Sequence, residues 1–131
     1  MKRKLIAIVT LLAAPWPAMA QDVDCANAQT QVEMTFCAEQ AWMAADEDLN
    51  LAYGMAQAAM KRLDSYLGDQ KGASAMLRDA QRAWIDFRDK ACAAEGYQAR
   101  GGSMEPMLIY MCRERLTRQR TEDLRLIGEE N

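Results

Sequence analysis

Four cysteines are the residues of this chain whose type and spacing most directly predict chemistry. They form two close pairs, Cys25 with Cys37 and Cys92 with Cys112, separated by a long stretch without another cysteine. Four cysteines allow three disulfide pairings. The spacing favours Cys25–Cys37 and Cys92–Cys112, because each bridge then closes a short loop and stabilises the fold by about 3 kcal/mol.

The other chemistries that cysteines support fit this sequence less well. The chain contains no histidine and no CxxC motif, whereas zinc sites combine closely spaced cysteine and histidine ligands and catalytic dithiols usually lie two residues apart. Without histidine the commonest general base is also missing, and nothing supplies a pair of nucleophile and base. We therefore expect no metal ion, no cofactor and no catalytic residues, and a binding protein rather than an enzyme.

The N-terminus has the pattern of an export signal. Three basic residues at positions 2–4 precede an apolar run of about ten residues, and Ala-Met-Ala at positions 18–20 supplies a cleavage site. The run is too short to span a bilayer comfortably, so an uncleaved anchor is the less favoured alternative. Because no cysteine lies at the cleavage point, we expect no lipid anchor. Residues 1–20 are thus predicted to be a signal peptide and residues 21–131 a single domain, soluble and periplasmic or secreted, where disulfides persist.

The distribution of charge disfavours anionic partners. Beyond residue 20 the chain has 13 basic and 19 acidic residues, a net charge of −6, so nucleic acid and anionic lipid are poor candidates. Residues 21–60 contain no lysine or arginine and seven carboxylates, at Asp22, Asp24, Glu33, Glu39, Asp46, Glu47 and Asp48. Solvated helix faces would explain any single charge, but the whole run could also be a docking surface for a basic protein.

Hydrophobic spacing predicts helices throughout, without the alternation typical of strands. A capping box from Thr30 to Glu33 precedes an apolar stripe with spacings of three and four, which ends at Leu67 before Gly68. A second stripe has Ser74 as its expected N-cap and is formed by Ala73, Leu77, Ala80, Trp84, Phe87, Ala91 and Ala94.

A third helix is expected after a glycine-rich connection, with Ser103 as its cap and its end near Ile127. Connections this short favour antiparallel neighbours. The sequence therefore predicts an all-α fold, a small antiparallel bundle of three to four helices stapled by two disulfides.

Three strings of residues, together with the paired cysteines, carry a family resemblance. They are Ala45-Asp46-x-x-Leu49-Asn50-x-x-Tyr53, Leu77-x-x-Ala80-Gln81-Arg82-Ala83-Trp84-Ile85-x-Phe87-Arg88-Asp89-x-x-Cys92, and Gly101-Gly102-Ser103 followed by Cys112-x-x-x-x-Thr117-x-x-Arg120-x-x-x-Leu124. On these residues the chain resembles the LprI-like lysozyme inhibitor family. The resemblance implies a helical, disulfide-bonded envelope protein that protects the cell wall from lysozyme.

The matching residues on the first two helices predict a polar network. They are Asp46, Asn50 and Tyr53 on the first helix, and Gln81, Trp84 and Arg88 on the second. In a hairpin that turns near residue 70, Arg88 lies opposite Asn50 and Tyr53, with Asp46 within reach of its long side chain. We interpret the six residues as a partly buried network that fixes helix register, with acid–base work by a carboxylate as the alternative.

The segment between Cys92 and Cys112 is the candidate partner-binding loop. It is rich in glycine and carries Tyr97, Arg100 and Ser103. A loop held by a disulfide loses less conformational entropy on binding. Because lysozymes cut glycans with two acidic residues in a cleft, Arg100 could enter such a cleft and meet both carboxylates. An ordinary exposed connection is the alternative.

The leading interpretation is a periplasmic binding protein that occludes the cleft of a lysozyme-type muramidase, with a basic lysozyme as its protein partner. The alternative is an envelope adaptor or immunity protein that binds another exported protein and does not inhibit lysozyme. An enzyme that acts on the cell wall is least favoured, because the chain lacks a catalytic constellation.

Overall fold

The computed structural model describes residues 23–129, which form three helices joined by short turns. The helices are α1 (Gln31–Leu67), α2 (Ala73–Gly96) and α3 (Glu105–Glu129), and a turn of 3₁₀ helix follows each of the first two, at Gly68–Gln70 and Tyr97–Ala99. No strand occurs among the described residues. The expected all-α bundle stapled by two disulfides is therefore confirmed, with three helices.

The N-terminal segment is fastened to the start of α1. The predicted signal peptide, residues 1–20, lies outside the described residues. From Cys25 a disulfide reaches Cys37 in the second turn of α1, with the two Cα atoms 5.5 Å apart. No helix in the described range is long and apolar enough to cross a membrane.

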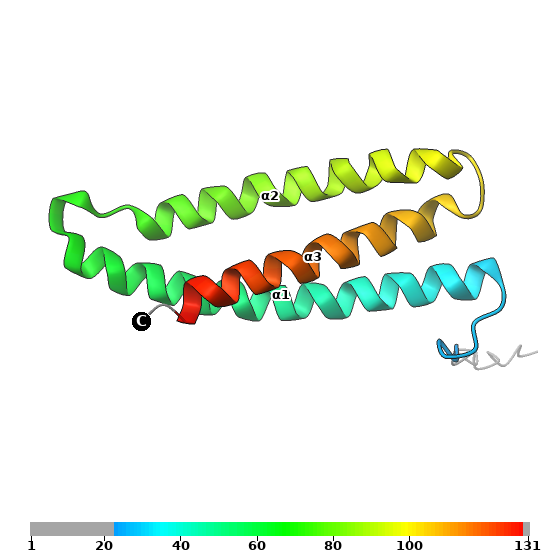
Figure 1. Ribbon diagram of the computed structural model, residues 1–131, viewed down its shortest axis with the longest axis horizontal. Helices are drawn as coiled ribbons and strands as arrows, with labels where there is room; N and C mark the ends of the chain where they lie inside the picture. Colours follow the sequence, from blue (N-terminus) through cyan, green and yellow to red (C-terminus); the bar gives the residue numbers. More distant parts are fainter. Residues whose placement is uncertain (1–22, 130–131) are drawn as a thin grey trace, which may run out of the picture.

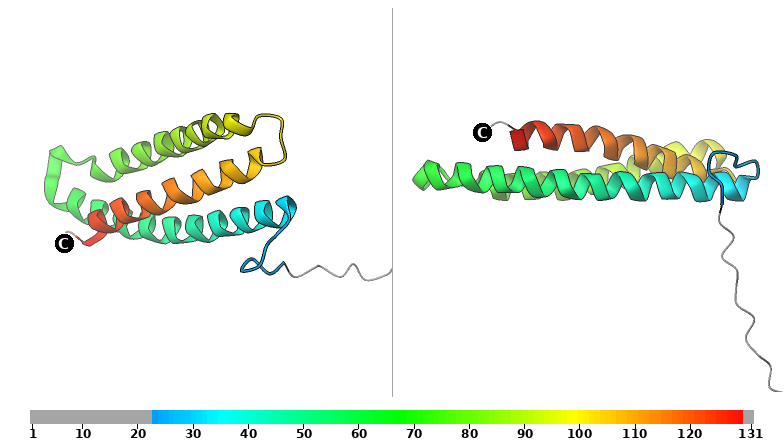
Figure 2. Two further views of the ribbon diagram at one scale, coloured as in Figure 1. Left: turned by 45° about the vertical axis from the view of Figure 1, so that its right-hand side comes forward. Right: turned by 90° about the horizontal axis from the view of Figure 1, so that it is seen from below.

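Successive helices reverse direction, so α1 and α3 are parallel while α2 is antiparallel to both (Figure 1). α3 packs more extensively on α1 than α2 packs on either. With 37 residues, α1 is about 55 Å long at 1.5 Å per residue. It continues past the end of α3, so the turn between α1 and α2 projects beyond the end of α3 in every view (Figure 2).

The first helix begins where its capping box predicts. The hydroxyl of Thr30 accepts a hydrogen bond from the backbone N–H of Glu33, and the carboxylate of Glu33 accepts one from the N–H of Thr30. The bond from the N–H of Thr30, followed by one from the N–H of Gln29, lowers the pKa of Glu33. Two of the N–H groups that a helix start leaves without partners are thereby satisfied.

Small side chains let α1 and α3 approach closely. Four of the five buried residues of α1 are alanine, and the fifth is Leu49, which packs in the core with Leu77 and Leu124. Near the end of α3, a Cβ added to Gly128 would lie 3.4 Å from the Cβ of Met55. With so few large aliphatic side chains buried, the core is thin, and the disulfides carry a larger share of the stability.

The predicted buried face of α2 is wrong in part. Of the expected apolar stripe, Ala80, Phe87 and Ala94 are exposed. The buried residues of the helix are Leu77, Gln81, Arg88, Cys92 and Gly96. Hydropathy misplaces this face because two of its members are polar side chains whose partners come from the other helices.

The expected N-cap of α2 is also wrong. The helix starts at Ala73 after Gly72, which has a φ of 152°, and Ser74 lies inside the first turn. The start of α2 is instead capped by Asp64, near the end of α1. The carboxylate of Asp64 accepts hydrogen bonds from the backbone N–H groups of Gly72 and Ala73 at 2.7 Å and of Ser74 at 3.1 Å. These bonds, led by the one from Gly72, hold the pKa of Asp64 well below its usual range. The cap thus fixes the turn between the two helices.

The second predicted disulfide joins α2 to α3. The Cα atoms of Cys92 and Cys112 are 5.4 Å apart, and both residues are buried. One turn further on, a Cβ at Gly96 would come within 2.6 Å of the Cγ1 atom of Ile109. Since only glycine leaves room for that contact, the disulfide and Gly96 together fix how closely α2 and α3 meet at this end.

Candidate functional site

A buried arginine lies where the three helices meet. The side chain of Arg88 on α2 is 7 % exposed and its Nη1 atom lies 3.0 Å from Oδ1 of Asp46 on α1. Its Nε atom donates to Asp89 at 3.0 Å, and Nη1 also donates to the hydroxyl of Thr117 on α3 at 3.4 Å. One side chain thereby links all three helices.

Aromatic rings enclose the same guanidinium group. Its central carbon is 5.2 Å from the ring centroid of Trp84 and 5.6 Å from that of Trp42. The guanidinium of Arg113 lies 4.9 Å from the Trp42 centroid, and its Nε atom is 3.3 Å from Asp89. Cations attract aromatic faces. The cluster therefore combines two arginines over tryptophan rings with two aspartates that neutralise their charge.

The structure brings together some of the six residues of the predicted polar network. Asp46, Trp84 and Arg88 meet as described. Gln81 is buried but accepts its hydrogen bond from Nε of Arg120 on α3 at 3.0 Å. Asn50 and Tyr53 do not bond to Arg88: Asn50 is exposed, and the Tyr53 hydroxyl accepts from Gln57. Both instead line an open groove of about 470 Å³ between α1 and α2.

Sequence reasoning left out the contribution of α3 to this cluster. Thr117 and Arg120 both belong to the string after Cys112 that carries the family resemblance, and Asp89 directly follows Arg88. Their inclusion in those strings was the available signal, but their roles depend on how α3 packs. In this arrangement Asp46 and Asp89 both accept hydrogen bonds from Arg88, and neither activates a nucleophile. The cluster therefore holds the three helices together.

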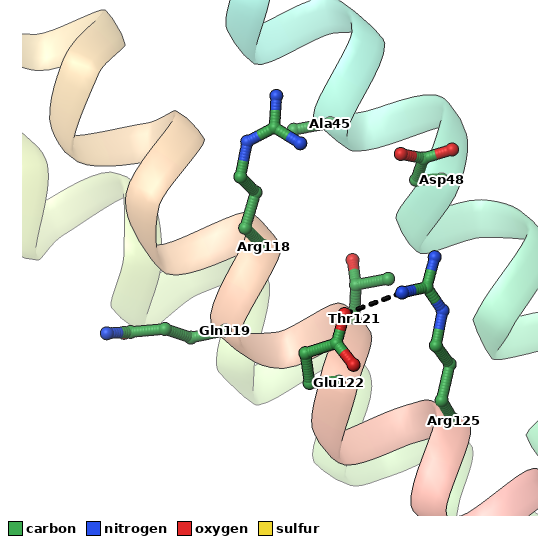
Figure 3. A pocket seen from close by; sticks show the side chains of 7 residues that line it. All are labelled: Ala45, Asp48, Arg118, Gln119, Thr121, Glu122 and Arg125. Carbon is green, nitrogen blue, oxygen red and sulfur yellow. Dashed lines mark hydrogen bonds and ion pairs between the residues drawn. The ribbon is translucent and has the colours of Figure 1, made fainter.

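A shallow groove runs between α1 and α3, with Ala45 and Thr121 among the residues that line it (Figure 3). Arg118 and Arg125 extend from α3 toward α1, with Arg118 ending near Ala45 and Arg125 near Asp48. Its volume is about 280 Å³, below the usual range for small-molecule sites. Both arginines are engaged on their own helix, with Glu114 and Glu122.

The predicted partner-binding loop is held by a carboxylate that sequence reasoning missed. Nη1 of Arg100 donates to Oε1 of Glu105 at 2.6 Å, and the N–H of Gly101 donates to Oε2 at 2.8 Å. Together, led by the bond from Gly101, they lower the pKa of Glu105, and Glu105 raises the pKa of Arg100. Since α3 starts at Glu105, the expectation that Ser103 caps this helix is wrong, and Ser103 is an exposed residue of the loop.

The loop presents an arginine to solvent in a fixed position. The guanidinium carbon of Arg100 lies 4.6 Å from the centroid of the Tyr97 ring. Its side chain is nevertheless 63 % exposed, and Tyr97 is 61 % exposed. Stacking and ion pairing restrict this side chain, so it loses less rotamer entropy when a ligand binds.

The acidic half of α1 lies at the same end of the molecule as this loop. In Figure 1 the N-terminal part of α1 and the turn between α2 and α3 are both at the right-hand end. Met107, near the start of α3, accepts from the side chain of Gln31 at 3.4 Å, which ties the two starts together. Of the carboxylates on α1, Glu33 and Glu39 lie toward this end, whereas Glu47 and Asp48 are exposed near the middle of the helix, beside Asp46 and its partner Arg88. The start of the acidic half of α1 and the loop therefore share one end, and the exposed charges of Glu47 and Asp48 lie further along α1.

Within the described residues no group of three or more aspartate, glutamate or cysteine side chains is placed to hold a metal ion.

A family model described as "Lysozyme inhibitor LprI" matches residues 24–124. An uncharacterised protein of Rhizobium meliloti (strain 1021) is 45 % identical over 129 residues, which covers 94 % of this chain and 93 % of the relative. A crystal structure of a DUF1311 family protein from Pseudomonas putida KT2440 has the same fold, with a TM-score of 0.64 and 24 % identity, over 80 % of this chain and all of the other.

Proposed function

We propose that this chain, which belongs to the lysozyme inhibitor LprI family, is a periplasmic protein that binds a lysozyme-type muramidase and blocks its cleft. Members of an inhibitor family act by binding a protein partner rather than by catalysis. In this proposal the chain is exported by its signal peptide, residues 1–20, and residues 21–131 act as a single domain. Its role is to protect the cell wall from hydrolysis.

The observation that supports this mechanism best is the exposed, pre-positioned Arg100. Lysozymes work with two acidic residues in a cleft, and a guanidinium group binds carboxylates through two parallel hydrogen bonds. On docking, Arg100 exchanges Glu105 for the enzyme's carboxylates, while Tyr97 and Ser103 contact the rim of the cleft. The Cys92–Cys112 disulfide keeps the loop in shape during this exchange.

The acidic half of α1 supports the first step of binding. Opposite charges on two proteins speed their encounter, and salt screens this effect over about 10 Å at 0.1 M ionic strength. A basic lysozyme attracted to the acidic half of α1, whose first turns lie at the same end as the loop, also approaches the loop. We therefore expect association to slow as salt rises, while dissociation depends on Arg100.

Lysozyme turnover on isolated cell walls, titrated with the protein at low and moderate salt, tests the proposal. Arg100→Ala should weaken inhibition at least tenfold, on the order of one charge-assisted hydrogen bond, without changing the melting temperature. Arg82→Ala, which removes an exposed arginine from the middle of α2, is the matched control and should inhibit normally.

Two outcomes would separate function from mechanism. If micromolar protein inhibits no c-type, g-type or i-type lysozyme, the inhibitor proposal fails and the envelope adaptor or immunity protein takes its place. If inhibition survives Arg100→Ala intact, the function stands and the loop mechanism is wrong.

A further inference from the structure

Side-chain exposure on α2 does not follow hydropathy. Its buried face includes Gln81 and Arg88, each 6 % exposed. The opposite face carries Met76 at 71 % and Phe87 at 59 % exposure, set among alanines. We call this exposed apolar stripe the outer seam, and its members are Met76, Ala80, Ala83, Phe87, Ala91 and Ala94.

The outer seam has the spacing of a helix-packing surface. Its members follow one another at intervals of three or four residues, so they lie along one side of the helix over about five turns. α2 forms one edge of the bundle in Figure 1, with α3 on its inner side. The outer seam therefore faces away from the bundle, and Ala91 is the one member that is half-buried.

We propose that the outer seam is the interface of a homodimer, in which α2 packs antiparallel against α2 of a second copy about a two-fold axis. Such an interface uses the same patch on both subunits, so the patch must be complementary to itself. With the axis at the level of Ile85, Phe87 lies at the level of Ala83 of the partner subunit. Met76 then lies at the level of Ala94 of the partner subunit.

This register pairs each large side chain with a small one. Phe87 and Met76 each meet an alanine, and the symmetry repeats both contacts, so the seam interdigitates without two bulky groups colliding. The alternation of large and small residues is thus what a second copy of the same helix requires.

The charges beside the outer seam match the same arrangement. Asp79 and Lys90 lie on one edge of the stripe, and in an antiparallel two-fold pair equivalent edges meet. With the axis at Ile85, Asp79 lies within about one residue of the level of Lys90 of the partner subunit, twice in each dimer. Within one subunit Asp79 pairs with its neighbour Arg78 at 2.9 Å, and Lys90 lies 3.9 Å from Asp86. The side chains of Asp79 and Lys90 are 58 % and 82 % exposed, so both are available to a partner.

The dimer leaves the proposed inhibitory loop outside the interface. Residues 97–105 follow the last member of the outer seam, and an antiparallel pair carries one such loop toward each end. The inference therefore does not depend on lysozyme inhibition. Dimerisation can fail while inhibition holds, and the reverse.

Sedimentation equilibrium of the purified protein, with both disulfides formed, tests the interface. We expect a reversible dimer whose dissociation constant rises at least 100-fold in Phe87→Glu, because the substitution removes two buried aromatic contacts per dimer. Leu51→Glu is the matched control: Leu51 is an exposed apolar residue on α1, 70 % accessible, and the dimer should be unchanged. A protein that stays monomeric at every concentration, or a dimer that Phe87→Glu leaves intact, overturns the proposal.

Charge exchange tests the antiparallel register. Asp79→Lys and Lys90→Asp should each weaken the dimer about tenfold, because each places like charges opposite one another, and the double variant should restore it. Circular dichroism melts check that each variant folds. Failure of the double variant to recover dimerisation overturns the register. If the protein is monomeric and Phe87→Glu instead abolishes lysozyme binding, the occupant of the outer seam is the enzyme and the dimer proposal is wrong.

Discussion

Removal of the Arg88 side chain should destabilise the fold, because its contacts link all three helices. Two carboxylates accept hydrogen bonds from Arg88, and their side chains are 38 % and 40 % exposed. Solvent screens such bonds, so each contributes on the order of 1 kcal/mol rather than the larger value of a fully buried pair. The contacts with the rings of Trp42 and Trp84 add about 0.5–1 kcal/mol each.

Arg88→Ala should therefore lower the free energy of unfolding by about 2–4 kcal/mol. The measurement is urea unfolding followed by far-ultraviolet circular dichroism, with both disulfides intact. Arg82→Ala, the exposed control on the same helix, should cost less than about 0.5 kcal/mol. Arg88→Met keeps an apolar stem between the tryptophans, and the freed carboxylates can rehydrate, so it should cost about half as much as the alanine variant.

The reasoning fails if Arg88→Ala costs less than about 0.5 kcal/mol. That result would mean that the contacts of Arg88 with α1 and α3 do not contribute to stability. A loss in Arg88→Met as large as in Arg88→Ala would instead assign the whole effect to the charge and none to packing between the tryptophans.

Three further predictions concern the turns and staples. Replacing Cys92 and Cys112 together by serine should destabilise the fold by about 3 kcal/mol in thermal or urea unfolding, and no loss would show that packing alone fixes that end. Because the pKa of Asp64 is lowered in the folded state, its stabilising effect is complete above its unfolded pKa near 4 and is lost as pH falls toward the folded value. Asp64→Asn should therefore make the free energy of unfolding depend less on pH on the acid side. A variant whose stability falls with pH in parallel with the unaltered protein would refute the cap. Gly96→Ala should cost about 1–3 kcal/mol by crowding the helix crossing, whereas Gly54→Ala, with open space around its Cβ, should gain about 0.5–1 kcal/mol; equal effects on melting temperature would contradict the packing described.

The first helix and the disulfides could be predicted because their signals are local. A capping box fixes the start of α1 through side chains three residues apart, and Gly68 marks its end. The cysteine pairing follows from short loops. The family resemblance rests on contiguous strings, and the match to the LprI family over residues 24–124 confirms it.

The orientation of α2 could not be predicted, because its buried face depends on partners from other helices. Hydropathy turns Phe87 inward, but Arg88 is covered by Asp46 from α1 and Thr117 from α3. Burial of a charge with its partners is a property of the assembled bundle. The same holds for Asp64, which caps a helix that begins several residues later in the chain.

Within the candidate site, the sequence identified the loop but not what holds it. The position of Tyr97 and Arg100 between two cysteines indicates a candidate partner-binding loop. The contact of Arg100 with Glu105 needs the chain to turn through Gly101, whose φ of 77° favours glycine. Spacing alone does not reveal that a carboxylate after the turn folds back on it.

Hydrogen exchange of the protein with and without saturating lysozyme tests the central claim most directly, since it locates the bound enzyme on the chain. The account predicts that the backbone amides of residues 97–105 exchange more slowly in the complex, and that Arg100→Ala removes this protection. Protection that appears elsewhere and leaves the loop unchanged, or no protection anywhere at saturating lysozyme, would contradict it.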